Sequence, residues 1–451
     1  MSNSINISAG DTIFALATAP GRSGVAVMRV SGLDTDLVIR SLTKRNLPKP
    51  RKAVLRKLVD QSDLVIDESL VFWFPKPRSF TGEDVAEFHI HGSPAVAEAI
   101  STALYQCGLR QAEPGEFTKR AFQNGKMDLT EAEGLADLID ANTEGQRQQA
   151  LRQMQGGLKE TYEAWRSQIL DALAFVEGEI DFPDEDDVPD ALAMRAGPGL
   201  KSLEKQLAEA LTQSTRGERV RHGVDIAVIG APNAGKSSII NKLSGKETVI
   251  VSDEAGTTRD IVEVHLEMAA LPVRVSDTAG LRSTENKIEA EGVRRAVARA
   301  ENADIRVLVV DASQPIDIAG ADSLTDGDFV VYNKLDLGKS HQLELDNVSR
   351  ETFSMSAATG EGYSEFVSAL EKAVKLRYGA TEQAGLTRAR HRDCVGRALD
   401  SISRASQNLS VAPELVGVDL RNALHAVKEL AGESDIEAVL DRVFSSFCIG
   451  K

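Results

Sequence analysis

The stretch GAPNAGKS, residues 230–237, decides the fold of the central part of this 451-residue chain. It follows the apolar run Val224–Ile229, which is typical of a buried strand, and it precedes an amphipathic stretch at 237–243. The glycines let successive backbone N–H groups point at a phosphate, and a helix beginning near Lys236 adds its positive end. The spacing predicts a phosphate-binding loop in which Lys236 reaches the β- and γ-phosphates and Ser237 ligates Mg²⁺.

Three further segments follow in the order that a GTPase requires. Residues 277–280, DTAG, close the apolar run 271–275, and Asp277 is placed to hold Mg²⁺ through water. Residues 333–336, NKLD, follow the run 329–332, and the Asp336 carboxylate can accept both the N1–H and the 2-amino group of guanine, which selects GTP over ATP. Residues 356–358, SAA, follow the run 351–355 and match the loop behind the guanine O6. Together they predict a Ras-like, doubly wound GTPase domain.

The polar segment 252–260 lies between the first two motifs. Thr258 is our candidate to complete the Mg²⁺ shell, and Gly256 gives the segment freedom to order around the γ-phosphate. Leu281 follows DTAG where Ras-like enzymes place a glutamine that orients water. A monovalent cation between Asn233 and backbone carbonyls of 252–257 is one substitute for that glutamine, and Arg259 is its rival.

The candidate GTP contacts therefore come from five short segments. They are Asn233, Ala234, Gly235, Lys236, Ser237, Ser238, Ser252, Asp253, Glu254, Ala255, Gly256, Thr257, Thr258, Asp277, Thr278, Ala279, Gly280, Asn333, Lys334, Leu335, Asp336, Ser356, Ala357 and Ala358.

These motifs, with AGTTRD at 255–260, DTAGLR at 277–282 and the terminal CIGK at 448–451, resemble the MnmE (TrmE) family of bacterial tRNA-modification GTPases. The resemblance covers the whole chain. Segments 17–32, 79–92 and 114–129 are similar to the folate-binding domain of that family.

The resemblance implies a K⁺-activated, homodimeric GTPase that acts with the FAD-containing flavoprotein MnmG. Together they would place an aminomethyl or carboxymethylaminomethyl group at C5 of the wobble uridine (U34) of certain tRNAs, with 5-formyl- or methylene-tetrahydrofolate as the one-carbon donor. It further implies K⁺ ligands at Asn233, Ser252, Glu254 and Thr257, Mg²⁺ ligands at Ser237 and Thr258, and folate contacts at Arg29, Glu87, Lys126 and Lys451.

Two further residues, Glu289 and Cys448, are candidates for a catalytic role, and for each a role without catalysis is the alternative. By the resemblance Glu289 positions the attacking water through a second water, whereas a glutamate on a charged helix is usually only solvated. Cys448 stands four residues from the end and is free to approach a one-carbon donor, but a lone cysteine near a terminus is often inert. We keep Glu289, Arg259 and Cys448 as candidate catalytic residues.

Helical periodicity brackets the GTPase motifs. Apolar positions recur at helical spacing from Leu151 to Val176, and again from about residue 384 to Leu430. We expect an N-terminal α+β folate-binding and dimerisation domain at 1–121, helical parts at 122–221 and 378–451, and the GTPase domain inserted at 222–377. Two separate helical domains are the alternative.

Composition narrows the functional classes. No apolar run approaches a membrane span, the first residues lack the features of a signal peptide, and three cysteines cannot form a disulfide framework, so we expect a cytoplasmic protein. The net charge of −16 argues against a protein that grips tRNA mainly through phosphates. Residues 44–57 nevertheless hold seven basic residues and no acidic one, which fits an RNA or acidic-partner contact or simply a solvated loop and strand edge. A ribosome-assembly or regulatory switch GTPase is the alternative function.

Overall fold

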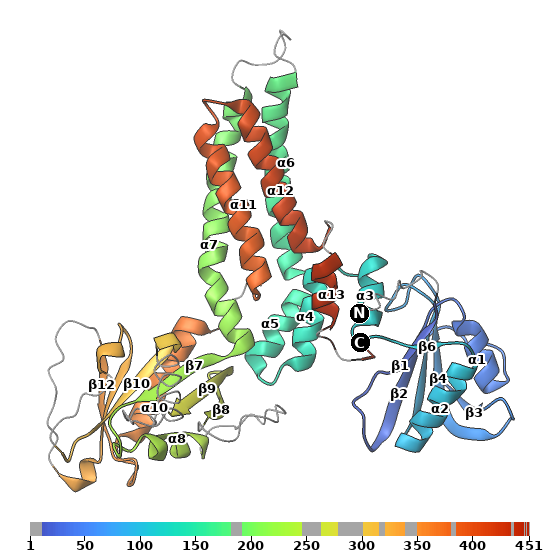
Figure 1. Cartoon of the computed structure of the whole chain (residues 1–451), viewed down its shortest axis with the longest axis horizontal. Helices are drawn as coiled ribbons and strands as arrows, with labels where there is room; N and C mark the ends of the chain where they lie inside the picture. Colours follow the sequence, from blue (N-terminus) through green and yellow to red (C-terminus); the bar gives the residue numbers. More distant parts are fainter. Residues whose placement is uncertain are drawn as a thin grey trace, which may run out of the picture. The chain divides into compact units, whose positions relative to one another are not determined.

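The computed structural model describes residues 11–181, 192–245, 263–277, 301–314, 321–338, 350–379, 385–433, 437–445, 447 and 449–450. The chain divides into two compact units, shown in Figure 1. The first contains residues 1–136 together with 428–451, and the second contains residues 137–427. Each unit is built around its own six-stranded sheet.

The sheet of the first unit is antiparallel except for one edge. Its strands are β1 (Ile13–Leu16), β2 (Ser23–Ser31), β3 (Val54–Val59), β4 (Val65–Phe74), β5 (Val85–Gly92) and β6 (Arg110–Gln111), in the order β3-β4-β5-β2-β1-β6. β1 and β6 are parallel. Helices α1 (Thr35–Thr43) and α2 (Pro94–Gln106) cover one face, where Val38, Ile39 and Leu104 join a core with strand residues such as Met28 and Phe88.

Helix α3 (Glu116–Gln123) packs beside β1 through Phe117, which forms a small cluster with Ile13 and Ala15. The C-terminal residues return to this unit. Phe444, on α13 (Glu437–Ser445), packs with Leu129 at the start of α4 (Leu129–Asp140), and residue 449 pairs with residue 114 in an isolated bridge. Residues 122–136 and 428–451, which the sequence analysis assigned to the helical domain, thus lie in the first unit.

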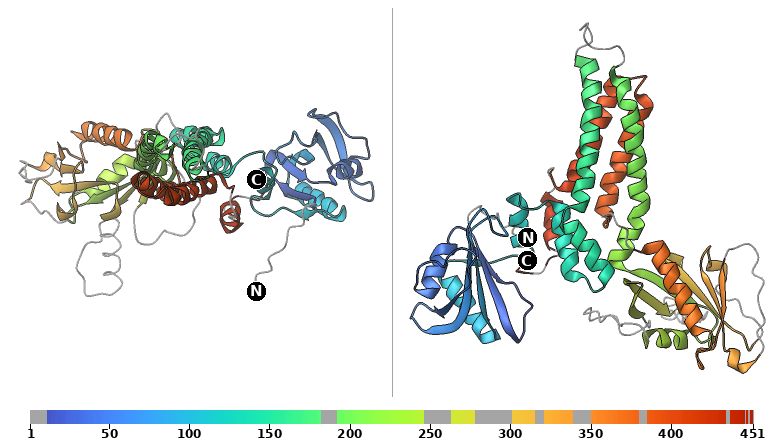
Figure 2. Two further views of the ribbon diagram at one scale, coloured as in Figure 1. Left: turned by 90° about the horizontal axis from the view of Figure 1, so that it is seen from above. Right: turned by 180° about the vertical axis from the view of Figure 1, so that it is seen from behind.

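The second unit contains a helical part built from both sides of the GTPase segment, seen in Figures 1 and 2. Its elements are α5 (Glu144–Met154), α6 (Gly157–Asp181), the 3-10 turn η1 (Leu192–Ala196), α7 (Gly197–His222), α11 (Ala389–Asn408) and α12 (Pro413–Ala431), whose last four residues belong to the first unit. α11 packs along α7, and Arg421 of α12 forms an ion pair with Glu177 of α6. The expected discontinuous helical domain is therefore confirmed, and the alternative of two separate helical domains is wrong.

The helical stretch expected from the apolar periodicity is divided into two helices in the structure. The stripe from Leu151 to Val176 spans two helices, because α5 ends at Met154 and α6 begins at Gly157. Gly156 has φ of +90°, a left-handed conformation that glycine adopts without steric cost and that ends a helix. Periodicity alone did not reveal the break, since Leu158, Tyr162 and Trp165 resume the buried stripe after it.

The second sheet is parallel except for one edge hairpin. Its strands are β7 (Val224–Ile229), β8 (Glu263–Met268), β9 (Leu271–Asp277), β10 (Ile305–Asp311), β11 (Phe329–Asn333) and β12 (Glu351–Ser354), in the order β12-β11-β10-β7-β9-β8. Only the β8–β9 pair is antiparallel. Helices α8 (Lys236–Ser244) and α10 (Tyr363–Tyr378) share one apolar core with the sheet, and a second core lies on its other face. The predicted doubly wound fold is confirmed.

No helix among the described residues combines the length and the apolar character needed to cross a membrane.

Candidate functional site

The phosphate-binding loop turns sharply between β7 and α8. Gly230, Asn233 and Gly235 have φ angles of +134°, +63° and +99°. A Cβ atom on Gly230 would lie 2.2 Å from the carbonyl oxygen of Val309, and one on Gly235 would lie 2.1 Å from Asn333 Nδ2. The two glycines therefore let the loop approach β10 and β11 closely, at the carboxyl ends of the parallel strands where ligands bind in such sheets.

Lys236 points back into this loop. Its Nζ donates hydrogen bonds to the carbonyl oxygens of Gly230 and Ala231, each at 2.8 Å, and only 4% of the residue is exposed. Burial lowers the pKa of this ammonium group, and the opposing charge of Asp277 raises it by a smaller amount. A buried cation that is held only by carbonyl dipoles attracts an anion such as phosphate.

Ser237 and Asp277 meet beside the loop, although forty residues separate them. Ser237 Oγ donates to Asp277 Oδ2 at 2.7 Å. The other carboxylate oxygen, Asp277 Oδ1, is buried and has no hydrogen-bond partner among the described residues. A hydroxyl and an unpartnered carboxylate oxygen are hard oxygen ligands of the kind that Mg²⁺ prefers, so this pair fits the ion that the GTPase motifs imply.

Asn333 ties the phosphate loop to the predicted guanine-binding loops. Its Nδ2 donates to the carbonyl oxygen of Ala234 at 2.9 Å, and its Oδ1 accepts from the backbone N–H of Ala357 at 2.9 Å. Ser356 Oγ donates to Asp336 Oδ1 at 2.5 Å, which fixes the carboxylate while Asp336 itself stays exposed. The NKLD and SAA segments thus lie together, with the candidate guanine acceptor facing solvent.

Two supporting contacts of this site escaped the sequence analysis. Lys334 Nζ forms an ion pair with Asp311 Oδ2 at 2.7 Å, and Lys242 Nζ donates to the carbonyl oxygen of Ala357 at 3.1 Å. Asp311 ends β10, and a polar residue at the carboxyl end of a buried parallel strand was a usable signal. Lys242 gave no such signal, because a lysine on a surface helix is ordinary.

Part of the predicted site falls outside the described residues. This applies to the segment 252–258 with its Mg²⁺ and K⁺ candidates, to residues 278–280, and to Arg259, Glu289, Cys448 and Lys451. The described candidates that the structure brings together are Asn233, Ala234, Gly235, Lys236, Ser237, Ser238, Asp277, Asn333, Lys334, Leu335, Asp336, Ser356, Ala357 and Ala358.

A second group of candidates lies in the first unit. Arg29 on β2 and Glu87 on β5 are directly opposite in the antiparallel register, and Glu87 Oε1 accepts from Arg29 Nε at 3.0 Å and from Nη2 at 2.9 Å. The Arg29 guanidinium lies 5.5 Å from the ring centre of Phe80 and 5.7 Å from that of Phe117. This paired, partly exposed charge close to two aromatic rings can bind a planar ligand with polar edges.

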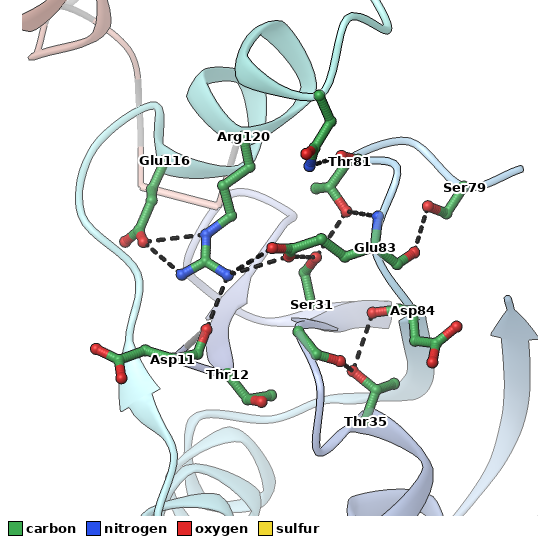
Figure 3. Close-up of polar contacts among 12 residues, drawn as sticks. Asp11, Thr12, Ser31, Thr35, Ser79, Thr81, Glu83, Asp84, Glu116 and Arg120 are labelled. Carbon is green, nitrogen blue, oxygen red and sulfur yellow. Dashed lines mark hydrogen bonds and ion pairs between the residues drawn. The ribbon is translucent and has the colours of Figure 1, made fainter. Parts of the chain in front are cut away.

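A buried polar network, drawn in Figure 3, holds the loop that carries Phe80. Arg120 donates to both carboxylate oxygens of Glu83 at 3.2 and 3.0 Å, and its Nη2 donates to Glu116 Oε1 at 2.9 Å. Ser31 Oγ adds a bond to Glu83 at 2.7 Å. Glu116 is only 2% exposed; burial alone would raise its pKa, but hydrogen bonds from Arg110, the Glu113 amide and Arg120 outweigh burial and lower it. The network thus joins the loop next to Phe80 to α3, the helix that carries Phe117.

Lys126 and the end of the chain approach the same region of the first unit. Asn124 Nδ2 donates to the carbonyl oxygen of Thr81 at 2.7 Å, and a Cβ atom on Gly82 would lie 3.4 Å from side-chain carbons of Lys126. Near the C-terminus, a Cβ atom on Gly450 would lie 2.3 Å from the carbonyl oxygen of Leu16, at the end of β1. Lys126 therefore lies against the loop that follows Phe80, and Gly450 lies against the end of β1, the strand next to β2 with Arg29.

Comparison with known proteins agrees with this arrangement. The family model "MnmE helical domain" matches residues 129–448, and "GTP-binding protein TrmE N-terminus" matches residues 12–126. The tRNA modification GTPase MnmE of Maricaulis maris is 52% identical over 98% of this chain and 99% of its own length. The protein of the same name from Parvibaculum lavamentivorans is 49% identical over 98% of this chain and 100% of its own length.

Proposed function

Since this chain belongs to the MnmE family of tRNA modification GTPases and hydrolyses GTP in tRNA modification, we propose that K⁺ activates the hydrolysis and that the flavoprotein MnmG is the partner. The two proteins would form a cytoplasmic heterotetramer around a homodimer of this chain. They would add an aminomethyl or carboxymethylaminomethyl group at C5 of the wobble uridine, U34, with a carbon from tetrahydrofolate. FAD would be carried by the partner.

GTP hydrolysis is supported best by one observation: Ser237 donates a hydrogen bond to Asp277 next to the buried Lys236. Lys236 would exchange its two carbonyl acceptors for phosphate oxygens, and Ser237 would turn its hydroxyl from Asp277 toward the metal. Mg²⁺ bound there would offset the negative charge on the phosphates. Asp336 would hold the guanine edge while Asn333 keeps the loops in register.

Asn233 supports the K⁺ proposal. It lies exposed in the phosphate loop with a positive φ of 63°, and the described residues offer its side-chain amide no hydrogen-bond partner. An amide oxygen in this position suits a weakly hydrated monovalent cation, and the remaining ligands would be backbone carbonyls of Ser252, Glu254 and Thr257. Such a charge next to the phosphates would take the place of an arginine finger.

The test is GTP hydrolysis by the purified full chain in K⁺, Na⁺ and Cs⁺ at equal ionic strength. We expect K⁺ to be strongly preferred, and we expect Asn233→Ala to lose the preference without losing Mg²⁺-dependent nucleotide binding. Equal kcat in Na⁺ and K⁺, or a full K⁺ response in Asn233→Ala, contradicts the proposal.

Glu289 is proposed to position the attacking water, with Thr258 on Mg²⁺ and Arg259 as the alternative source of positive charge. Glu289→Ala is expected to lower kcat much more than GTP affinity, whereas Arg259→Ala should leave kcat nearly unchanged in K⁺. An unchanged kcat in Glu289→Ala would assign the residue to the solvated surface of its segment.

The folate proposal rests on Arg29 and Glu87, with Lys126 and Lys451 as further contacts. Calorimetric titration of the full chain with 5-formyltetrahydrofolate should show one site per chain, weakened in Arg29→Ala. Cys448→Ser in the reconstituted modification assay asks whether the thiol takes part in the chemistry. A chain that binds no folate would favour a switch GTPase without a modification reaction.

A further inference from the structure

One edge of the first unit carries exposed cations that the GTPase and folate sites do not use. We propose that this edge is a docking surface for the phosphate backbone of tRNA. The basic edge is defined by four exposed residues, Arg45, Lys49, Lys52 and Arg78. The inference rests on the tRNA modification role of the chain and assigns that substrate a place on its surface.

The loop between α1 and β3 carries Arg45, Lys49 and Lys52, and its turn lies beside Arg78. Residues 49–52 form a tight turn in which the Lys52 N–H donates to the Lys49 carbonyl oxygen at 3.2 Å. Pro50 and the positive φ of Arg51, +58°, are the features of a type II turn. The Arg51 N–H donates to the Trp73 carbonyl at 2.9 Å and its guanidinium donates to the Arg78 carbonyl, so the turn lies against the loop that carries Arg78.

Other cations of this region are already engaged within the unit. Arg56 donates to the carbonyl oxygen of Asn46 at 2.6 Å, and burial together with the charge of Arg45 lowers its pKa. Lys44 forms an ion pair with Asp63 at 3.0 Å. Lys57 lies opposite Glu68 across the β3–β4 pair. We therefore leave these three out of the basic edge.

Arg51 is left out as well, because its guanidinium bonds the Arg78 carbonyl oxygen. The four cations that remain, Arg45, Lys49, Lys52 and Arg78, have no ion pair among the described residues. A solvated surface normally mixes charges of both signs, yet residues 44–57 contain no acid in a chain with a net charge of −16. Repulsion between the rest of the chain and RNA makes a local cationic surface necessary for any phosphate contact.

Backbone conformation also distinguishes this edge. Within the described residues of the first unit, the non-glycine residues with positive φ are Lys44, Arg51 and Asp63, and of these only Arg51 lies in the turn that carries Lys49 and Lys52. Each costs roughly 1 kcal/mol relative to glycine. Lysines that discourage edge-to-edge pairing of β3 would account for Lys57, but they do not account for cations in the loops beyond the strand.

The chemistry of the edge favours phosphates over bases. The large exposed apolar side chains on β3, β4 and their turn are Leu55, Leu64, Val65 and Leu70, none of them aromatic. Sequence-tolerant binding of unpaired bases uses exposed aromatic rings for stacking, whereas Trp73, the aromatic residue bonded to this turn, is only partly exposed. We expect contact with a paired arm of tRNA and little dependence on its sequence.

The experiment measures binding of fluorescently labelled bulk bacterial tRNA to the full chain between 50 and 200 mM KCl. The test variant replaces Arg45, Lys49, Lys52 and Arg78 with alanine. The matched control replaces Lys201, Lys205, Lys372 and Lys375, which are exposed on α7 and α10, and so makes the same change in net charge. Melting temperature and K⁺-dependent GTP hydrolysis check that both variants are folded.

If the four residues contact four phosphates, the slope of log K against log salt should be less steep by about 3 to 4 in the test variant. Between 50 and 200 mM KCl the unaltered chain should then lose about 100-fold more affinity for tRNA than the test variant loses. The control should keep the original slope. A second variant, Lys49→Ala with Lys52→Ala, should remove about half of the effect.

Equal losses in both variants, an unchanged slope in the test variant, or no tRNA binding by the unaltered chain at 50 mM KCl would each overturn the inference. So would weaker binding to the flavoprotein partner with tRNA affinity unchanged, because the edge would then belong to a protein interface. In all these cases intact K⁺-dependent hydrolysis and folate binding leave the proposed function standing.

Discussion

The two six-stranded sheets of this chain present their candidate residues in different ways. In the parallel sheet of the second unit, the candidates lie in loops that leave the carboxyl ends of β7, β9, β11 and β12, and each motif is contiguous in sequence. In the antiparallel sheet of the first unit, Arg29 and Glu87 project from the strands themselves and meet only through the β2–β5 register.

The two sheets also stabilise their sites differently. The GTPase site is held largely by backbone atoms, since Lys236, Lys242 and Asn333 all bond carbonyl or amide groups of neighbouring loops. The folate candidate is held by side-chain charge pairs, with Arg120 and Glu116 nearly buried behind it. Damage to a loop site should therefore remove catalysis while the fold persists, whereas damage to the charge network should loosen the fold around its site.

The largest effect is expected from Ser237→Ala. Loss of the hydroxyl removes an Mg²⁺ ligand and the partner of Asp277, and we expect kcat for GTP hydrolysis to fall about 10²–10³-fold with unchanged melting temperature. Ser244→Ala, at the end of the same helix, is the control and should hydrolyse GTP normally. Normal turnover in Ser237→Ala would remove this residue from the metal site.

Glu116→Gln should show the opposite pattern. Removing one charge of a buried pair typically costs about 3 kcal/mol, and here two arginines lose their partner. We expect faster hydrogen exchange in α3 and β6 and weaker folate binding, with GTP hydrolysis kept. Glu113→Gln is the control, because Glu113 bonds to Glu116 through its backbone N–H and carbonyl oxygen. Unchanged exchange in α3 would show that the network carries little stability.

Arg29 and Glu87 should be energetically coupled in folate binding. A double-mutant cycle with Arg29→Ala and Glu87→Ala, read out as affinity for 5-formyltetrahydrofolate, should give a coupling energy of about 1–2 kcal/mol. Additive losses would mean that each side chain contacts the ligand independently of the other.

Acidification should change the local stability of the two units in opposite directions, and this is the smallest of the expected effects. The pKa of Glu116 is lowered from 4.5, so its contribution is present above that value and is lost as the pH falls through the lower, folded value. The pKa of Asp304 is raised from 3.8, first by burial, so the protonated form is favoured in the folded state and acidification through that window stabilises its surroundings.

Hydrogen exchange at pH 7 and at a pH well below 4.5 should therefore show a loss of protection in α3 that Glu116→Gln lacks. At the start of β10, where the Asp304 carboxylate accepts from the Asp225 N–H, protection should increase on acidification relative to α3. Asp304→Asn should remove that increase. The same pH response in both regions would show that these two carboxylates do not control it.

The sequence predicts more residues of the candidate GTPase site than of the candidate folate site in the first unit. Gly230, Lys236, Ser237 and Asp336 could be assigned because local motifs in a parallel sheet lie next to the strand ends where the ligand binds. Asp311 and Lys242 were missed, since they act through contacts made by other loops. In the first unit the candidates came from family resemblance, and no local pattern pointed to Arg120 as the centre of a buried network.

The sequence by itself determined the nucleotide-binding fold, the order of its motifs and the insertion between two helical stretches, because phosphate loops, strand periodicity and helical stripes are local properties of the chain. Only the tertiary structure decided that Ser237 meets Asp277, that Arg29 meets Glu87, and that the C-terminal residues return to the first unit. These contacts depend on strand register and on packing between elements far apart along the chain, which no local pattern encodes.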